Sequence, residues 1–336
     1  MARKSSLIAS FFVVVILSIT AFYINSLVFK QITKGYDIYA SYSEGQHLLN
    51  GENPYARIQT GDMRTNQKYA TYFPVFYELS YLSQAAGFRT VKTWIGFWRI
   101  IFVLFELATA IFLYVVLAKN RFEWVGVFAA AFWLFNRWTL NLVETQNLDF
   151  IPIFLFLVSL TLFSQKRGLS LLLCSCSLGF KQIAIFAVPL YLIWEFRETG
   201  QNQIKHVLKS ALMIAIIPLV TGLPFLFWDA SAFLKSILFS ATRLTGSYSE
   251  VSSLDVLLKW DGLPARAVML ALMLFIYLLA FKGQLPKYFS VLLVMIVFVG
   301  FNNTLFPQYL LWVMPLILLA VFDWIETSRA APKESQ

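Results

Sequence analysis

Long apolar runs recur along almost the whole chain and limit its fold more than any other feature. A helix of about 20 apolar residues is long enough to cross a bilayer. Charged residues make up only 13% of the chain, whereas a soluble globular domain has about 25%. The sequence therefore predicts an all-α polytopic membrane protein, one integral membrane domain over residues 1–336 with about nine or ten transmembrane helices. The runs are 6–29, 94–117, 122–140, 150–163, 169–194, 207–228, 265–281, 288–301 and 305–322.

Two polar stretches are predicted to be loops, a first outer loop at 30–93 and a second long outer loop at 229–263. In membrane proteins, Lys and Arg concentrate in the cytoplasmic connections between helices. Applied to this chain, this positive-inside rule puts both loops on the non-cytoplasmic side. It requires the shorter apolar segment 73–86 to be re-entrant or interfacial, and 169–194 to enter and return as two half-helices that meet near Lys181. The expected cytoplasmic cations are Arg3, Lys4, Lys119, Arg121, Lys166, Arg167, Arg197, Lys205, Lys282, Lys287, Arg329 and Lys333.

Residues 36–51 of the first outer loop predict an amphipathic helix. At roughly 100° per residue, Asp37, Ser41 and Glu44 share one face, with apolar side chains opposite. We expect this helix to lie on the membrane surface with its acidic face turned to the protein. An acid at a helix start is also stabilised by the helix dipole, so Asp37 has a structural interpretation beside a functional one.

Lys181 lies in the middle of an apolar run. A lysine at the centre of a bilayer costs about 2.5–3.5 kcal/mol or more, so we expect a helix break that lets it face a polar cavity. An ionisable residue at that depth is a functional-site hypothesis by default. Snorkelling or local pairing is the structural alternative.

Several motifs, taken in order, resemble a known family of membrane enzymes. Asp37 is followed by Gly-Glu-Asn-Pro-Tyr at 51–55, Tyr-Phe-Pro at 72–74, Phe-Asn at 135–136, Gln-Asn-Leu-Asp at 146–149, Gly-Phe-Lys-Gln at 179–182 and Phe-Pro-Gln-Tyr-Leu-Leu-Trp at 306–312. This series is similar to that of GT-C glycosyltransferases, in particular bacterial polyprenol-phosphate-mannose α-mannosyltransferases and the catalytic subunit of GPI mannosyltransferase I. The chain departs from the family at Arg137 and Gln146, where Pro and Gly are usual, and in having one acid at Asp37 instead of Asp-x-Asp.

The resemblance implies a GT-C fold and a multi-pass enzyme, in the bacterial cytoplasmic membrane, whose active site faces outwards. It implies inverting transfer of a sugar, mannose before others, from a polyprenyl-phosphate donor to a lipid-linked or glycan acceptor. This chemistry needs a base that takes the proton of the acceptor hydroxyl at the bilayer surface, and Asp37 is the expected catalytic residue. It also needs a cation that stabilises the departing phosphate.

Three cations are candidates for the donor phosphate: Lys181, Arg243 and Arg64. Arg243 lies in a polar stretch of the second outer loop that the family uses near the donor, whereas Arg64 lies in a polar stretch where simple solvation is the alternative. The other expected substrate-binding residues are Tyr72, Asn147, Asp149, Gln308 and Tyr309. Asn147 and Asp149 could instead cap a helix. Gln308 and Tyr309 could instead serve helix packing.

The sequence has no His, Cys and carboxylate pattern with metal-ligand spacing, so no cofactor is predicted. The single acid at Asp37 leaves a divalent metal open. There is no nucleotide-binding glycine motif, and the cations suit membrane topology and lipids more than nucleic acid. A secondary transporter is the main alternative function, because an intramembrane Lys181 and Asp149 with broken helices also describe that class. A non-catalytic subunit of a membrane assembly is a second alternative.

Overall fold

The computed structural model describes residues 2–28, 36–60, 70–200, 202–239, 253–260, 263–302 and 305–330. Within these ranges every regular element is a helix, and no β-strand occurs. The elements are α1 (Ala2–Leu27), α2 (Asp37–Leu49), η1 (Ala56–Gln59), α3 (Val75–Ala85), α4 (Val91–Lys119), α5 (Glu123–Phe135), α6 (Arg137–Thr145), α7 (Phe150–Leu162), α8 (Arg167–Phe180), η2 (Gln182–Ala187), α9 (Val188–Glu198), α10 (Gln203–Trp228), α11 (Ala230–Ile237), α13 (Leu254–Leu257), α14 (Leu263–Phe281), α15 (Lys287–Gly300) and α16 (Pro307–Ala330).

Four of the described helices, α1, α4, α10 and α14, are long and apolar enough to cross a membrane. Their outward faces expose large apolar side chains, among them Phe12, Ile100 and Leu208. Such a surface would be costly in water and suits contact with acyl chains. The predicted all-α membrane protein agrees with this architecture.

The other apolar segments are shorter than these four helices. The described segments Glu123–Phe135, Phe150–Leu162, Arg167–Phe180, Lys287–Gly300 and Gln308–Asp323 are apolar but have fewer than 18 residues. A helix of 13 residues, such as α5, is about 20 Å long. Polar residues divide the runs: Asn136 ends α5 and accepts hydrogen bonds from the N–H groups of Trp138 and Thr139 at 3.0 and 2.9 Å, which begins α6. The run 122–140 is therefore two helices.

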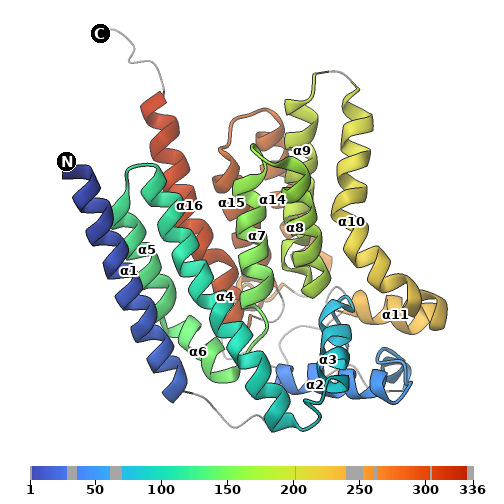
Figure 1. The fold of residues 1–336 in the computed structure, drawn as a ribbon. Coiled ribbons are helices and arrows are strands. Elements are labelled where there is room, and N and C mark those ends of the chain that lie inside the picture. The colour runs from blue at the N-terminus through green and yellow to red at the C-terminus, as the bar shows by residue number, and fades with distance from the viewer. Residues whose placement is uncertain are drawn as a thin grey trace.

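The start of α1 and the end of α16 lie at the same end of the bundle (Figure 1). The cation-rich connections of the chain gather there too. Lys287 is the first residue of α15, and its Nζ lies 2.6 Å from Glu198 Oε1 at the end of α9. Phe122 and Phe322 bring the α4–α5 connection against α16, with ring centroids 5.8 Å apart. We call this end the cationic end; the compartment in which it lies stays a prediction.

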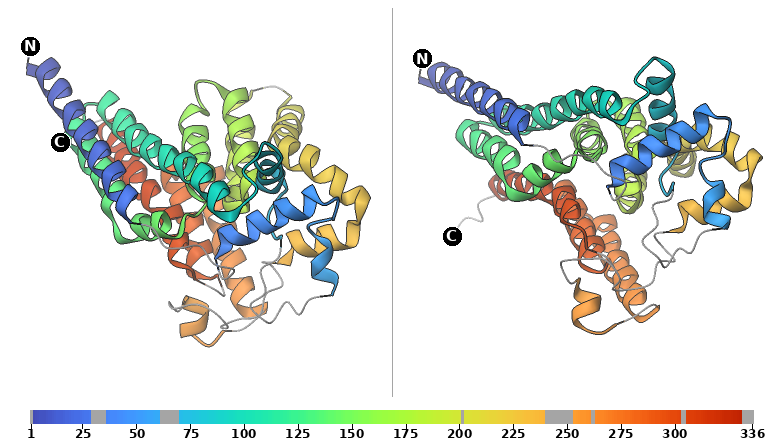
Figure 2. Two further views of the ribbon diagram at one scale, coloured as in Figure 1. Left: turned by 60° about the horizontal axis from the view of Figure 1, so that its bottom comes forward. Right: turned by 90° about the horizontal axis from the view of Figure 1, so that it is seen from below.

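At the other end of the bundle lie α2, α6 and α11 (Figure 1). Seen from that end, α2 runs across the bundle and not along it (Figure 2). Ser41 and Glu44 of α2 are buried, as predicted for the acidic face. Part of its apolar side is buried as well: Ile38 and Tyr42 are buried, and the rings of Tyr42 and Trp94 pack with centroids 5.5 Å apart. The predicted contact of that side with lipid is therefore wrong for Tyr42.

Helix α3 lies within the segment predicted to be re-entrant or interfacial and packs closely on α2. Gly45 permits this approach, since a Cβ atom there would lie 2.3 Å from Ser80 Oγ and 2.6 Å from Gln84 Nε2. Gln84 Nε2 also donates to the carbonyl of Tyr42 at 2.9 Å. The two short helices thus form one unit beside the bundle.

The segment 169–194 enters and returns, as the sequence predicts. Helix α8 ends at Phe180, and η2 and α9 lead back to the cationic end. Arg167, at the start of α8, forms ion pairs with Glu195 and Glu198 at the end of α9. Lys181 therefore lies at the turning point of this hairpin.

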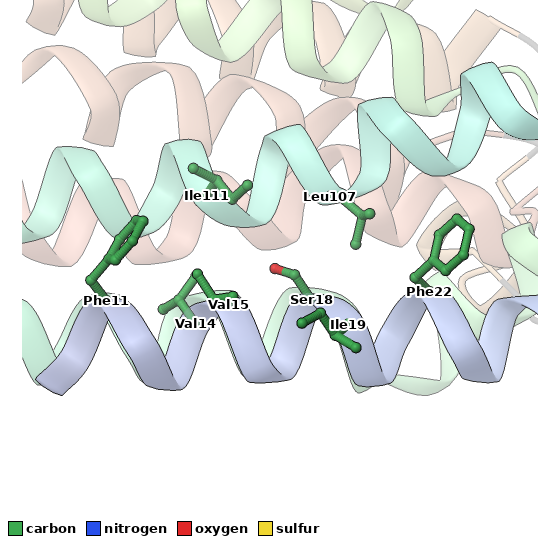
Figure 3. A pocket seen from close by; sticks show the side chains of 8 residues that line it. All are labelled: Phe11, Val14, Val15, Ser18, Ile19, Phe22, Leu107 and Ile111. Atoms are coloured by element: carbon green, nitrogen blue, oxygen red, sulfur yellow. The ribbon is translucent and has the colours of Figure 1, made fainter.

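Helices α1 and α4 leave an apolar cavity of about 320 Å³ between them (Figure 3). It is lined by Phe11, Val14, Val15, Ser18, Ile19, Phe22, Leu107 and Ile111. The ionisable residues of the predicted site do not line this cavity, so it belongs to the packing of the bundle and not to the candidate site.

Candidate functional site

Lys181 and Asp149 form a buried ion pair. Lys181 Nζ lies 2.6 Å from Asp149 Oδ1, and the two side chains are 4% and 0% exposed. The lysine reaches this position because α8 ends at Phe180 and the backbone of Lys181 is extended, with φ −162° and ψ 139°. The predicted helix break is present, and the lysine is paired locally with a carboxylate, which is the structural alternative that the sequence left open. Burying two opposite charges together offsets part of their desolvation cost.

Two aromatic rings flank the lysine ammonium. Lys181 Nζ lies 5.0 Å from the ring centroid of Tyr72 and 5.4 Å from that of Trp312, within the range of cation–π attraction. The Trp312 ring is held by Tyr309 at a centroid distance of 4.3 Å and by Phe298 at 6.0 Å. Tyr72 thus contacts the site directly, whereas Tyr309 reaches it through Trp312.

Asp37 lies beside this ion pair and is the more exposed of the two aspartates. It is the first residue of α2, and its side chain is half-buried. Gln308 Nε2, in the first turn of α16, donates a hydrogen bond of 3.4 Å to Asp37 Oδ2. The charge of Asp37 also acts on the carboxylate of Asp149. Asp37 is therefore less enclosed by protein than Asp149, whose side chain is 0% exposed.

A turn between α6 and α7 places Asp149. Gln146 ends α6 in the left-handed region with φ 55°, and Asn147 Oδ1 accepts a hydrogen bond from the N–H of Asp149 at 3.3 Å. Helix α7 begins at Phe150, and the Asp149 side chain makes no capping hydrogen bond to it. The capping alternative is therefore wrong for Asp149, whereas Asn147 shapes the turn.

Trp312 was not among the predicted site residues, although its motif was noted. It follows Gln308 by four positions on α16, so the two side chains lie on one helix face. This spacing is the signal in the sequence that relates Trp312 to the site. The predicted phosphate ligands Arg64 and Arg243 lie outside the described residues.

A second charged pair, Glu44 with Arg57, lies farther along α2. Arg57 Nη1 donates to Glu44 Oε1 at 2.7 Å, and the Glu44 side chain is fully buried. Burial raises the pKa of Glu44 to about 8, while the positive charge of Arg57 acts in the opposite direction. The helical pattern predicted the inward direction of Glu44, but not that η1 would supply its partner.

The cluster that we call the polar cluster consists of Asp37, Tyr72, Asp149, Lys181, Gln308 and Trp312. It brings together motifs that lie far apart in the sequence. No family model, no curated protein and no solved structure matches the chain. Within the described ranges, no three His, Cys, Asp or Glu side chains gather closely enough to bind a metal ion.

Proposed function

We propose that this chain is a GT-C glycosyltransferase. It transfers a sugar, mannose before others, from a polyprenyl-phosphate donor to a lipid-linked or glycan acceptor. The observation that supports this most is the meeting of Asp37 with the Lys181–Asp149 pair and Gln308 at the end of the bundle opposite the cationic end. These residues come from separate motifs of the family that the chain resembles.

In the proposed reaction, Asp37 is the general base. The acceptor oxygen attacks the anomeric carbon and forms the new glycosidic bond, and its proton passes to Asp37. The bond between the anomeric carbon and the phosphate oxygen breaks, and polyprenyl phosphate leaves with the electron pair. A direct displacement inverts the anomeric carbon, so a β-linked donor gives an α-linked product.

The remaining residues of the polar cluster bind and orient the substrates. Lys181 supplies positive charge for the departing phosphate, and Asp149 holds that charge in place until the donor arrives. Arg64 and Arg243 remain candidates for further phosphate contacts on the basis of the sequence. Gln308 orients the Asp37 carboxylate through its amide group. No resident cofactor is proposed.

The site faces the non-cytoplasmic side in this proposal. Cationic connections mark the cytoplasmic end of membrane proteins, and the polar cluster lies at the other end of the bundle. A bacterial cytoplasmic membrane would supply a polyprenyl-phosphate donor in the leaflet next to the site. Membrane lipids and the two substrates are the proposed partners.

The test is transfer by the detergent-purified protein. It is incubated with polyprenyl phosphates that carry different single sugars, together with an acceptor fraction extracted from the membrane. Mass spectrometry then identifies the consumed donor and the product. We expect consumption of the mannosyl donor; hydrolysis or transfer of none of the donors would contradict the proposal.

A secondary transporter is the second candidate, and one observation favours it. The buried Lys181–Asp149 pair lies at a helix break, and such pairs mark ion or proton pathways in transporters. Uptake of a solute into proteoliposomes that contain the protein would indicate a transporter, and sugar transfer without uptake would indicate an enzyme. Asp37→Asn should abolish transfer by an enzyme, whereas Asp149→Asn should be the damaging change in a coupled transporter.

A further inference from the structure

The short loop that bears Tyr72 has its backbone held by side chains. It lies between the described start at Ala70 and α3, and it belongs to no helix. The N–H groups of Thr71 and Tyr72 donate to Tyr77 Oη at 3.1 and 3.3 Å. The carbonyl of Thr71 accepts from Gln182 Nε2 at 3.1 Å, and that of Tyr72 accepts from Tyr55 Oη at 2.8 Å. The backbone polar groups of this loop are therefore satisfied by side chains, and not by other backbone groups as in a helix or a sheet.

Tyr77 has the central position in this arrangement. It lies in the first turn of α3, is 2% exposed, and its one oxygen receives both N–H groups. Two neighbouring N–H groups that converge on one acceptor fix the direction of the intervening peptide. That peptide sets where the Tyr72 ring points, and the ring lies 5.0 Å from Lys181 Nζ.

Tyr55 supports the same loop from the other side. Its ring packs edge-on against Tyr77, Phe225 and Phe233 at centroid distances of 6.0, 5.2 and 5.0 Å. Burial raises the pKa of both the Tyr55 and the Tyr77 hydroxyl well above 10, so both stay protonated. The Tyr55 hydroxyl can therefore keep donating to the Tyr72 carbonyl.

We infer that Tyr77 is a positioning residue: its hydroxyl oxygen holds the Thr71–Tyr72 peptide so that the Tyr72 ring covers Lys181. The inference deepens the proposed function and rests on it for its catalytic meaning. By covering the lysine, the ring keeps water from the ammonium and holds the ammonium where the donor phosphate binds. Tyr77 touches neither substrate, and it acts through Tyr72.

Chemical labelling tests this positioning without any substrate. The detergent-purified full chain is treated with limiting formaldehyde and cyanoborohydride, and mass spectrometry follows dimethylation of Lys181, with the exposed Lys92 as internal reference. Tyr77→Phe keeps the ring and removes the oxygen, and we expect Lys181 to react about fivefold faster, the effect of losing one cation–π contact of ordinary strength. Tyr72→Ala should give at least the same increase.

Tyr191→Phe is the matched control, because this hydroxyl is equally buried and bonds Ser159 within the α7–α9 packing. It should leave the Lys181 rate unchanged. If Tyr77→Phe does not fold, Tyr55→Phe removes the donor to the Tyr72 carbonyl and should expose Lys181 in the same way. Unchanged Lys181 labelling in folded Tyr77→Phe, or in Tyr72→Ala, would overturn the inference.

Kinetics then connect the positioning to the proposed reaction. We expect Tyr77→Phe to raise KM for the polyprenyl-phosphate donor about fivefold while kcat stays within about twofold of the parent. A purely structural defect would lower the active fraction and hence kcat at unchanged KM. If the parent transfers no sugar, the proposed function fails and the labelling result still stands. If the parent is active and Tyr77→Phe has parental KM, the positioning role fails alone.

Discussion

Lys181 and Asp149 hold their charges 2.6 Å apart in a part of the molecule that solvent does not reach. The lysine comes from the break after α8 and the aspartate from the turn before α7. Neither charge has another opposite partner among the ion pairs of the described residues.

Breaking this pair from one side should destabilise the protein strongly. Lys181→Met leaves the Asp149 carboxylate buried without its cation, and we expect a loss of about 3–5 kcal/mol. The variant Lys181→Met/Asp149→Leu removes both charges and should recover most of that loss. Chemical denaturation in detergent measures the free energies of unfolding. Equal destabilisation in the single and double variants would contradict the coupling.

The separation of α2 and α3 should depend on Gly45. Gly45→Ala places a Cβ 2.3 Å from Ser80 Oγ, and overpacking of this kind costs about 1–3 kcal/mol. Gly96→Ala is the matched control, since a Cβ there meets nothing within 4 Å and alanine suits a helix interior better than glycine. Thermal melting should therefore fall for the first variant and not for the second. A parental melting temperature for Gly45→Ala would show that the two helices can separate without cost.

Glu44 should make stability depend on pH. Its pKa rises from 4.5 in the unfolded chain to about 8 in the folded one, so the folded state binds the proton more tightly. This contribution is fully present below about pH 4.5, declines as the pH rises, and is lost above about pH 8. Glu44→Gln should flatten the decline between these values in melting experiments. Arg57→Gln should enlarge it, because the opposing charge is removed. An unchanged pH profile for Glu44→Gln would contradict the burial argument.

The two ends of the bundle should lie in different compartments. In a background without Cys174 and Cys176, single cysteines at Thr60 and Asn302 should react with an impermeant maleimide added to intact cells, and cysteines at Gln165 and Gln284 should not. The neighbouring Gly283 is unsuitable for a cysteine, because a Cβ there would lie 2.2 Å from Arg197 Nη2. Labelling of Thr60 and Asn302 from opposite sides would contradict the topology.

Much of the architecture follows from the apolar pattern, and its failures have identifiable causes. The cost of a lysine in an apolar run predicted the break at Lys181 and the return of the chain. The pattern overlooked the division at Asn136, although an asparagine before a helix is a common cap. Hydropathy averages over such a residue because its neighbours on both sides are apolar.

The sequence predicted which residues belong to the candidate site better than it predicted which of them contact one another. The motifs named Asp37, Asp149 and Lys181 separately, but pairing between α7 and the end of α8 is decided by how the helices pack. The roles of Tyr77 and Tyr55 depend on hydroxyl groups that meet a loop seventeen or fewer residues away in the sequence. Neither tyrosine differs in pattern from the many aromatic residues of the chain.

The most direct test of the account is single-turnover sugar transfer by Asp37→Asn. Asparagine keeps the size of the side chain and its contact with Gln308, but it cannot accept the proton of the acceptor hydroxyl. Loss of a general base lowers the rate about 10²- to 10⁴-fold, and we predict a decrease of this size with parental donor binding and a parental melting temperature. A folded Asp37→Asn protein that transfers the sugar at more than about a tenth of the parental rate would contradict the base role.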